Sequence, residues 1–148
     1  SAYQIQGLAG FDDEIELEGT YSNGTRQIVW RAMASWREIF YYISPYLIKP
    51  YTHDGVKEIL RAAICGRDGV VTRLNKFNDQ VFQTVAIQLK ALGLVRIDVS
   101  KGTDGKNHPF WRLTAEGEKM MVEIRTIKKI SVSDPNKENE IEENDVEV

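Results

Sequence analysis

The most regular pattern of apolar and polar positions in the chain lies between residues 78 and 95. Its apolar side has helical spacing and comprises Phe82, Val85, Ala86, Leu89 and Leu92. The opposite side comprises Gln80, Gln83, Thr84, Ile87 and Ala91. Asn78 is suited to accept hydrogen bonds from the free amides of a helix start, and Gly93 tolerates the left-handed conformation of a helix end. The pattern therefore predicts an amphipathic helix over residues 79–92.

After Gly93 the spacing of apolar residues changes from helical to alternating. Residues 94–99 have the alternation of a strand, residues 100–108 form a turn rich in glycine and lysine, and residues 110–113 return as a second strand. Helix, strand, loop and strand follow one another in the order of a winged helix-turn-helix. The sequence predicts that fold, with the wing at residues 100–109.

A β-hairpin is predicted ahead of the helices, over residues 11–35. Acidic and apolar residues alternate over 14–18, which is typical of a strand with one side in water. Asn23 and Gly24 both tolerate the positive φ of a tight primed turn, so the following run is expected to pair back. The acidic cluster at residues 12–14 is compatible with a solvated edge or with metal ligands. Because neighbouring side chains in a strand point in different directions, we favour the solvated edge.

Two helices are predicted between this hairpin and the segment at 79–92. Ser35 and Glu38 have the spacing of a capping box, in which each side chain bonds the other residue's backbone amide. Pro45 ends or kinks the helix that follows, because it has no amide donor. A second helix is expected over about residues 54–65. Residues 70–77 are ambiguous, and we interpret them as the third, edge strand of the wing sheet.

The C-terminal part is predicted to be a helix followed by a polar tail. Thr114 is placed to cap the helix, which is expected to continue to about residue 130. Its apolar stripe comprises Met120, Met121, Ile124 and Ile127. Residues 131–148 contain seven acidic side chains and one basic side chain, without aromatic residues. Such a segment buries too little apolar area to offset its ordering entropy, so we expect a disordered tail.

Together these elements predict an α+β fold, a winged helix-turn-helix with an N-terminal β-hairpin and a disordered acidic C-terminal tail. The expected boundaries are 1–34 for the hairpin lead-in, 35–130 for the winged-helix domain and 131–148 for the tail. With 148 residues, 42% of them hydrophobic, the chain is large enough for one core and too small for a second large domain. The chain begins at Ser1 without an initiator methionine, which is typical of a processed product or of an excised piece of a longer protein, and we favour the excised piece.

The formal net charge of −3 is distributed unevenly. Residues 1–52 hold four basic and six acidic side chains, residues 53–130 hold fourteen and nine, and residues 131–148 hold one and seven. The region that contains the wing is thus mildly basic, which permits nucleic-acid binding without requiring it. The acidic tail either competes with nucleic acid for that region or acts as a solvating tail, and the solvating tail is the commoner case.

The sequence contains no membrane span and no disulfide framework. Its longest apolar run, residues 39–48, is interrupted by serine and proline and is shorter than the roughly 20 residues that span a bilayer. Cys65 is the single cysteine and is expected to be a small buried apolar residue. A reducing, cytoplasmic compartment is the natural inference.

Enzyme and metal signatures are also missing. The chain has no serine elbow, no His-Glu-x-x-His pair and no dinucleotide glycine pattern. Residues 102–107 lack the glycine spacing and the hydroxyl residue of a phosphate loop, so a wing turn is the better interpretation. His53 and His108 have no cysteine or paired carboxylate at ligand spacing. We therefore expect no enzyme activity, no cofactor, no metal and no small-molecule substrate.

Two functions fit the pattern, nucleic-acid binding and protein recognition. In a winged helix the recognition helix, here residues 79–92, enters the major groove while the wing contacts phosphates. The candidate binding residues are Gln80, Gln83, Thr84, Ile87 and Lys90 on the helix, and Lys101, Lys106, His108 and Arg112 on the wing. The helix lacks arginine and exposes Ile87, which equally suits packing on another protein. We place a protein partner or self-association first and nucleic acid second.

Three stretches resemble the C-terminal region of a bacterial family of unknown function. They are residues 33–40, Met-Ala-Ser-Trp-Arg-Glu-Ile-Phe; residues 43–47, Ile-Ser-Pro-Tyr-Leu; and residues 79–95, with Phe-Gln-Thr and Leu-Lys-Ala-Leu-Gly-Leu. Members of that family typically carry an N-terminal α/β domain of flavodoxin-like or TIR-like type, which is absent here. The resemblance extends over about residues 11–115. It implies a winged-helix accessory module of a larger intracellular protein, such as a sensor or adaptor in defence or signalling, and it brings no catalytic residues.

Overall fold

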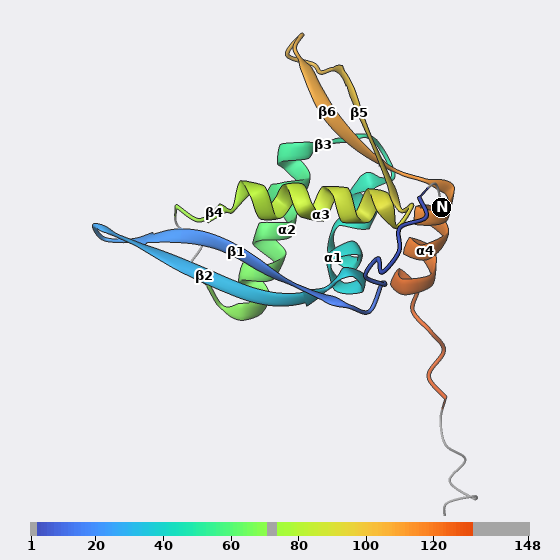
Figure 1. Cartoon of the computed structure of the whole chain (residues 1–148), viewed down its shortest axis with the longest axis horizontal. Coiled ribbons are helices and arrows are strands. Elements are labelled where there is room, and N and C mark those ends of the chain that lie inside the picture. Colours follow the sequence, from blue (N-terminus) through green and yellow to red (C-terminus); the bar gives the residue numbers. More distant parts are fainter. Residues whose placement is uncertain (1–2, 71–73, 132–148) are drawn as a thin grey trace, which may run out of the picture.

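The computed structural model describes residues 3–70 and 74–131. This part of the chain is a mixed α+β structure with four α-helices and two small antiparallel sheets (Figure 1). The helices are α1 (Trp36–Ile43), α2 (His53–Asp68), α3 (Asp79–Ala91) and α4 (Ala115–Arg125), and a short 3-10 helix, η1 (Ser44–Leu47), follows α1. The strands are β1 (Glu14–Asn23), β2 (Arg26–Ser35), β3 (Tyr51–Thr52), β4 (Lys76–Phe77), β5 (Val95–Lys101) and β6 (Asn107–Leu113). None of the described helices is both long and apolar enough to cross a membrane.

Each sheet is a β-hairpin extended on one side by a two-residue strand. The strand order is β2-β1-β4 in the first sheet and β3-β6-β5 in the second. The prediction that residues 70–77 complete the wing sheet is wrong, because β4 pairs with β1 and β3 takes the place beside β6. Residues 71–73 of that predicted strand lie outside the described part of the chain. Figure 1 shows the two hairpins leaving the helical body in different directions.

A glycine in β1 explains why β4 joins the first sheet. A Cβ atom at Gly19 would collide with the indole of Trp30 and with the carbonyl oxygen of Lys76. Because Gly19 has no Cβ atom, the Trp30 indole can lie across β1. For the same reason β4 can approach β1 closely. Trp30 Nε1 donates to Asn75 Oδ1 at 2.9 Å, and its ring meets Phe77 edge-on with 5.8 Å between centroids. The first hairpin is therefore held against the segment that precedes α3.

The first hairpin forms where predicted, but its turn is displaced by one residue. Asn23 pairs with Arg26, which leaves Gly24 and Thr25 as the two-residue connection. In this connection Gly24 has a positive φ, +65°, whereas Asn23 has an ordinary strand conformation. A single positive φ at the first connecting residue meets the requirement of a type II′ turn, so Asn23 remains available to complete the strand.

The predicted helix caps are present, although the capping box is incomplete. Ser35 Oγ accepts a hydrogen bond from the Glu38 amide at 3.0 Å, and Asn78 Oδ1 accepts one from the Val81 amide at 3.0 Å. Glu38 does not return the bond to Ser35, because its carboxylate accepts from the Arg67 guanidinium at 2.6 Å. A bond between two charged groups is stronger than one to a neutral amide, so the end of α2 captures this side chain.

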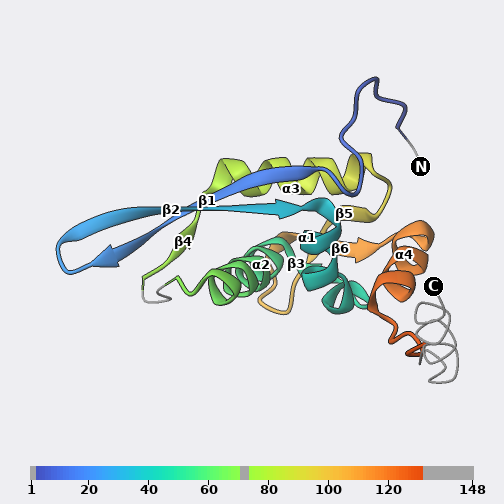
Figure 2. The same ribbon diagram turned by 90° about the horizontal axis from the view of Figure 1, so that it is seen from below.

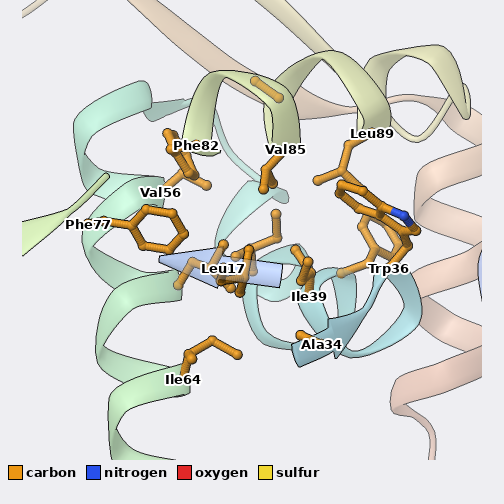
Figure 3. Packing of buried hydrophobic residues seen from close by; sticks show 14 of the residues in the cluster. Leu17, Ala34, Trp36, Ile39, Val56, Ile64, Phe77, Phe82, Val85 and Leu89 are labelled. Carbon is orange, nitrogen blue, oxygen red and sulfur yellow. The ribbon is translucent and has the colours of Figure 1, made fainter. Parts of the chain in front are cut away.

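The apolar side of α3 packs into the centre of the core (Figure 3). Phe82, Val85 and Leu89 point from α3 toward Leu17 of β1 and Ile39 of α1, and all five are fully buried. The first hairpin and the helices thus share one hydrophobic cluster. Burial of this side leaves the opposite side of α3 to face outward.

Helix α4 is shorter than predicted. It ends at Arg125, and the expected apolar stripe packs against the core only as far as Ile124. Ile127 is 99% exposed, so the prediction that it extends the stripe is wrong. At this end the Arg125 guanidinium lies over the Tyr41 ring of α1, 4.2 Å from its centroid. The predicted tail, from residue 132 onward, lies outside the described part of the chain.

Candidate interaction face

The outer side of α3 is exposed at the five positions named as candidates. We call these residues the α3 face: Gln80, Gln83, Thr84, Ile87 and Lys90. Ile87 has 66% of its surface accessible, which is high for a large apolar residue inside a helix. Ala91 shares this side in the helical pattern but is buried, because α3 ends there and the chain turns into β5. Figure 2 shows α3 on one side of the molecule and α1 and α2 on the other.

The α3 face is almost uncharged. Lys90 is its single charged residue, and it lies in the last turn of the helix. At the opposite end, Asp79 Oδ1 is 3.1 Å from Lys57 Nζ of α2, so the first-turn carboxylate is already paired. The N-terminal segment borders the face, because the Gln88 side-chain amide donates to the carbonyl oxygen of Ala9 at 3.0 Å.

The predicted wing residues lie on opposite sides of the second hairpin. Side chains alternate along a strand, and paired residues of antiparallel strands share a side. The register places Lys101 on the side of the buried Trp111, whereas His108 and Arg112 belong to the opposite side. Lys106 lies in the connecting turn. These four side chains therefore do not form one row that faces a phosphate backbone.

Asp104 organises the wing turn. Its Oδ1 accepts from the Lys106 backbone amide at 2.9 Å, and its Oδ2 lies 2.7 Å from His108 Nε2. These hydrogen bonds, the one from the Lys106 amide first, hold the pKa of the Asp104 carboxyl below its ordinary value. Gly105, with φ +79°, supplies the left-handed residue that the turn requires. The turn thus carries a carboxylate that opposes the attraction of its lysine for anions.

Lys57 and Arg96, near the α3 face, form ion pairs, whereas other cations have none within the described part of the chain. Arg96 of β5 pairs with Asp98 at 3.5 Å, and Lys57 pairs with Asp79 as described above. Four candidate cations have no ion pair with any described residue: Lys90, Lys101, Lys106 and Arg112. All four are exposed, and the alternation of the hairpin places Lys101 and Arg112 on opposite sides of it.

The sequence reasoning missed the cluster that attaches the wing to the helices. His53 is the first residue of α2, one residue before the predicted helix start, and its Nδ1 accepts from Trp111 Nε1 at 2.9 Å. Trp111 also stacks on Phe82 of α3, with centroids 5.5 Å apart and an interplanar angle of 14°. A tryptophan within the predicted strand at residues 110–113 was the signal in the sequence that could have indicated this cluster. The alternation of that strand places Trp111 on one side and Arg112 on the other.

His53 is neutral in this arrangement. Its Nδ1 is an acceptor, and its Nε2 is buried with no hydrogen-bond partner among the described residues. Burial is the main cause that lowers the pKa of His53 below its usual 6.5, against the opposing charges of Asp54 and Asp79. Protonation would turn Nδ1 into a donor that faces the indole donor of Trp111.

A groove of about 550 Å³ lies beside the α3 face, where the N-terminal segment, α3, β5 and the start of α4 meet. Its lining includes Lys90, Arg96, Asp98 and Glu116. Two basic and two acidic side chains give this groove no preference for one sign of ligand charge. In the described part of the chain, no group of three or more histidine, cysteine or acidic residues is arranged to hold a metal ion.

Comparisons of the chain with protein-family models, with curated proteins and with solved structures found no match.

Proposed function

We propose that this chain is a winged-helix module that recognises a protein partner through the α3 face. The order α1, β3, α2, α3, β5, β6 and the sheet order β3-β6-β5 support this assignment, with α3 as the recognition helix and the second hairpin as the wing. One departure lies between α2 and α3, which are separated by residues 69–78, whereas a helix-turn-helix has a turn of three to four residues. That longer connection contains β4, which serves the first sheet.

The observation that carries the proposal is the composition of the α3 face. Four of its five side chains are uncharged, and Ile87 is two-thirds exposed. Phosphate contacts supply most nonspecific affinity for DNA, so a DNA-binding face is expected to gather cations. An exposed isoleucine among glutamine and threonine instead suits a protein surface, because burying apolar area contributes about 25 cal/mol per Å².

A wider setting for the module follows from what the resemblance of residues 11–115 to a bacterial family implies. It adds the proposal that the module is a noncatalytic accessory part of a larger cytoplasmic protein in a bacterium. In that setting the partner of the α3 face is either another domain of the same protein or a separate chain.

Nucleic-acid binding is the second candidate function. Lys101 and Lys106 favour it, because both are exposed near the tip of the wing and have no ion pair in the described part of the chain. Glutamine pairs with adenine and threonine contacts the thymine methyl group, so Gln83 and Thr84 fit base edges. The division of the wing cations between two sides of the hairpin, together with Asp104, weakens this case.

Photo-crosslinking tests the protein interface directly. A photoreactive amino acid replaces Ile87 in one variant and Val122 in a matched control, since both are exposed apolar residues on helices. We expect a discrete crosslinked protein from position 87 in cells that naturally produce the chain, and none from position 122. Equal labelling from both positions would contradict an interface at the α3 face.

A DNA titration separates the second candidate from the first. Fluorescence anisotropy of a mixed-sequence duplex is measured at two salt concentrations, with the chain complete and with residues 132–148 removed. We expect no salt-sensitive binding in either form. Salt-sensitive binding without a crosslink at position 87 would contradict protein recognition and favour nucleic-acid binding as the function.

A further inference from the structure

No strand of the described part of the chain pairs with the outer edge of β2, a long strand at the end of the first sheet. Ten consecutive residue pairs join it to β1 without a bulge, and the opposite edge of the sheet is the two-residue β4. Natural sheets usually protect a long edge with charges, proline or a bulge, because its unpaired backbone groups bind other strands. Residues 27–31 of β2 contain one charged residue, Arg31, and no proline. This edge lacks the usual protection.

The backbone groups of alternate residues in β2 point toward that edge. The Arg67 guanidinium donates to the carbonyl oxygen of Met33 at 2.9 Å, which identifies the outward series as Met33, Arg31, Val29 and Gln27. Arg67 closes the edge at Met33. The backbone groups of the next three outward residues have no hydrogen bond from any described residue. We call residues 27–31 the open edge, and its centre is Val29.

The open edge is accessible and held in an extended form. Figures 1 and 2 show the first hairpin reaching well beyond α2, with β4 on the side of β1. The contacts of Trp30 with Asn75 and with β1 fix the hairpin at this point. Val29 has 48% of its surface exposed. A preformed strand loses little conformational entropy when another strand pairs with it.

We propose that two copies of this chain associate by antiparallel pairing of their open edges, with the two-fold axis at Val29. In this register Arg31 faces Gln27 of the second copy, so no like charges meet. Arg31 also keeps its ion pair with Glu18 of its own β1 at 3.0 Å. Every outward backbone group of the open edge then gains a partner, and the two three-stranded sheets join into one of six strands.

Two registers whose axis lies closer to Met33 are disfavoured by charge or by an occupied carbonyl oxygen. An axis at Arg31 sets the two arginines opposite each other, and like charges directly opposite are destabilising. An axis at Trp30 brings Gln27 opposite Met33, whose carbonyl oxygen already accepts from Arg67. The pairing does not rest on the function proposed for the α3 face, which stays free in the dimer.

Sedimentation velocity of the full chain tests the association. Between about 10 µM and about 1 mM, the range of small transient interfaces, we expect a concentration-dependent shift from monomer to dimer. Val29→Pro removes an outward amide that is not part of the β1 ladder, and proline is tolerated in edge strands. This variant is expected to weaken dimerisation at least about tenfold while its thermal midpoint stays close to that of the parent chain.

A pair of lysine variants controls for the added charge. Val29→Lys and Thr20→Lys place the same group on the same side of the sheet, because residues 20 and 29 are cross-strand partners. Only the first lies at the open edge. We expect Val29→Lys to weaken dimerisation and Thr20→Lys to leave it unchanged.

Disulfide trapping tests the register. Paired Cα atoms at a hydrogen-bonded site are about 5.5 Å apart, within the range that a disulfide bridges. Val29→Cys is therefore expected to form a covalent dimer in a glutathione buffer, whereas Arg31→Cys is not, since its two copies lie about 13 Å apart at four residues of strand rise. Native Cys65 does not interfere, because it is buried and burial raises the pKa of its thiol.

Three outcomes would overturn the proposal. The first is a full chain that stays monomeric at every concentration, including the case in which removal of residues 132–148 releases a dimer, because the tail would then occupy the edge. The second is a dimer that Val29→Pro leaves intact. The third is faster trapping through Arg31→Cys than through Val29→Cys, which would place the axis elsewhere.

Discussion

The two β-hairpins share one plan and differ in how their outer strands are protected. Both are antiparallel, uninterrupted and extended by a two-residue strand. The outer strand of the second hairpin, β5, carries Arg96, Asp98 and Lys101 within seven residues. The outer strand of the first, β2, carries two arginines within ten residues. Charged edges resist pairing with other strands, so the second hairpin suits solvent and polar surfaces, whereas the first suits strand pairing.

Each hairpin contributes one buried tryptophan to its contacts with the body. Trp30 donates to Asn75 and Trp111 donates to His53, each over 2.9 Å. The two indoles are linked through Phe77 and Phe82, whose ring centroids are 5.7 Å apart. The attachments of the two hairpins therefore belong to one continuous aromatic chain, and Phe82 is the member that touches both halves.

Phe82→Ala is expected to have the largest effect, because it removes the ring that joins the two attachments. Phe82 is fully buried, so the loss of unfolding free energy is expected to be about 3 to 5 kcal/mol. Urea denaturation followed by tryptophan fluorescence measures it. Ile87→Ala on the same helix is the control and is expected to change stability by about 0.5 kcal/mol or less. Similar midpoints for the two variants would mean that the buried side of α3 is misassigned.

Gly19→Ala is expected to disturb the first hairpin and to spare the second. Its methyl group collides with the Trp30 indole and the Lys76 carbonyl, and such overpacking costs about 1 to 3 kcal/mol. Amide hydrogen exchange should show faster exchange in β1 and β2 than in β5 and β6. Gly66→Ala in α2 meets no neighbouring atom and is expected to stabilise by about 0.5 to 1 kcal/mol. Equal loss of protection in both hairpins would contradict separate attachments.

Lowering the pH is expected to destabilise the attachment of the second hairpin, because it protonates His53. Because burial lowers the pKa of His53 in the folded chain, the unfolded chain binds the proton more tightly. The contribution of neutral His53 to stability is therefore complete above about pH 6.5 and is lost as the pH falls through the lowered folded pKa.

His53→Asn keeps an acceptor for the Trp111 indole and removes the titration. Thermal midpoints of the parent and this variant, measured from pH 7.5 to pH 5 in steps of about half a unit, are expected to diverge with falling pH in that window. Parallel profiles for the two proteins would contradict a role for His53 in this range. Amides of the first hairpin are expected to be insensitive to this substitution.

Removing the wing lysines is expected to have the smallest effect on stability. Lys101→Ala combined with Lys106→Ala deletes two exposed cations and should change the unfolding free energy by about 0.5 kcal/mol or less. If the second hairpin contacts phosphates, the same variant lowers the salt slope of DNA binding by about two. An unchanged slope would exclude these lysines from any nucleic-acid contact.

Elements with local signals were predictable from the sequence. The cap at Asn78, the periodic side of α3 and the stop at Gly93 all depend on contacts within a few residues, and each is present. Ile87 was expected to be exposed for the same reason. The sheet that β4 joins was predicted wrongly, because two strand residues contain no information about their pairing partner. The space that Gly19 leaves for β4 exists only once β1 and β2 are paired.

Sequence alone determined the order of the four helices and the two hairpins, the N-terminal helix caps and the exposed side of α3. These features follow from backbone propensity and periodicity, which act over a few residues. Tertiary structure decided the sheet that β4 joins, the neutral state of His53 and the edge of β2 that no described strand covers. Each of these depends on contacts between residues far apart in the chain. The space left by Gly19 allows β4 to pair with β1, and the position of Arg67 determines which backbone carbonyl oxygen of β2 has a hydrogen-bond donor.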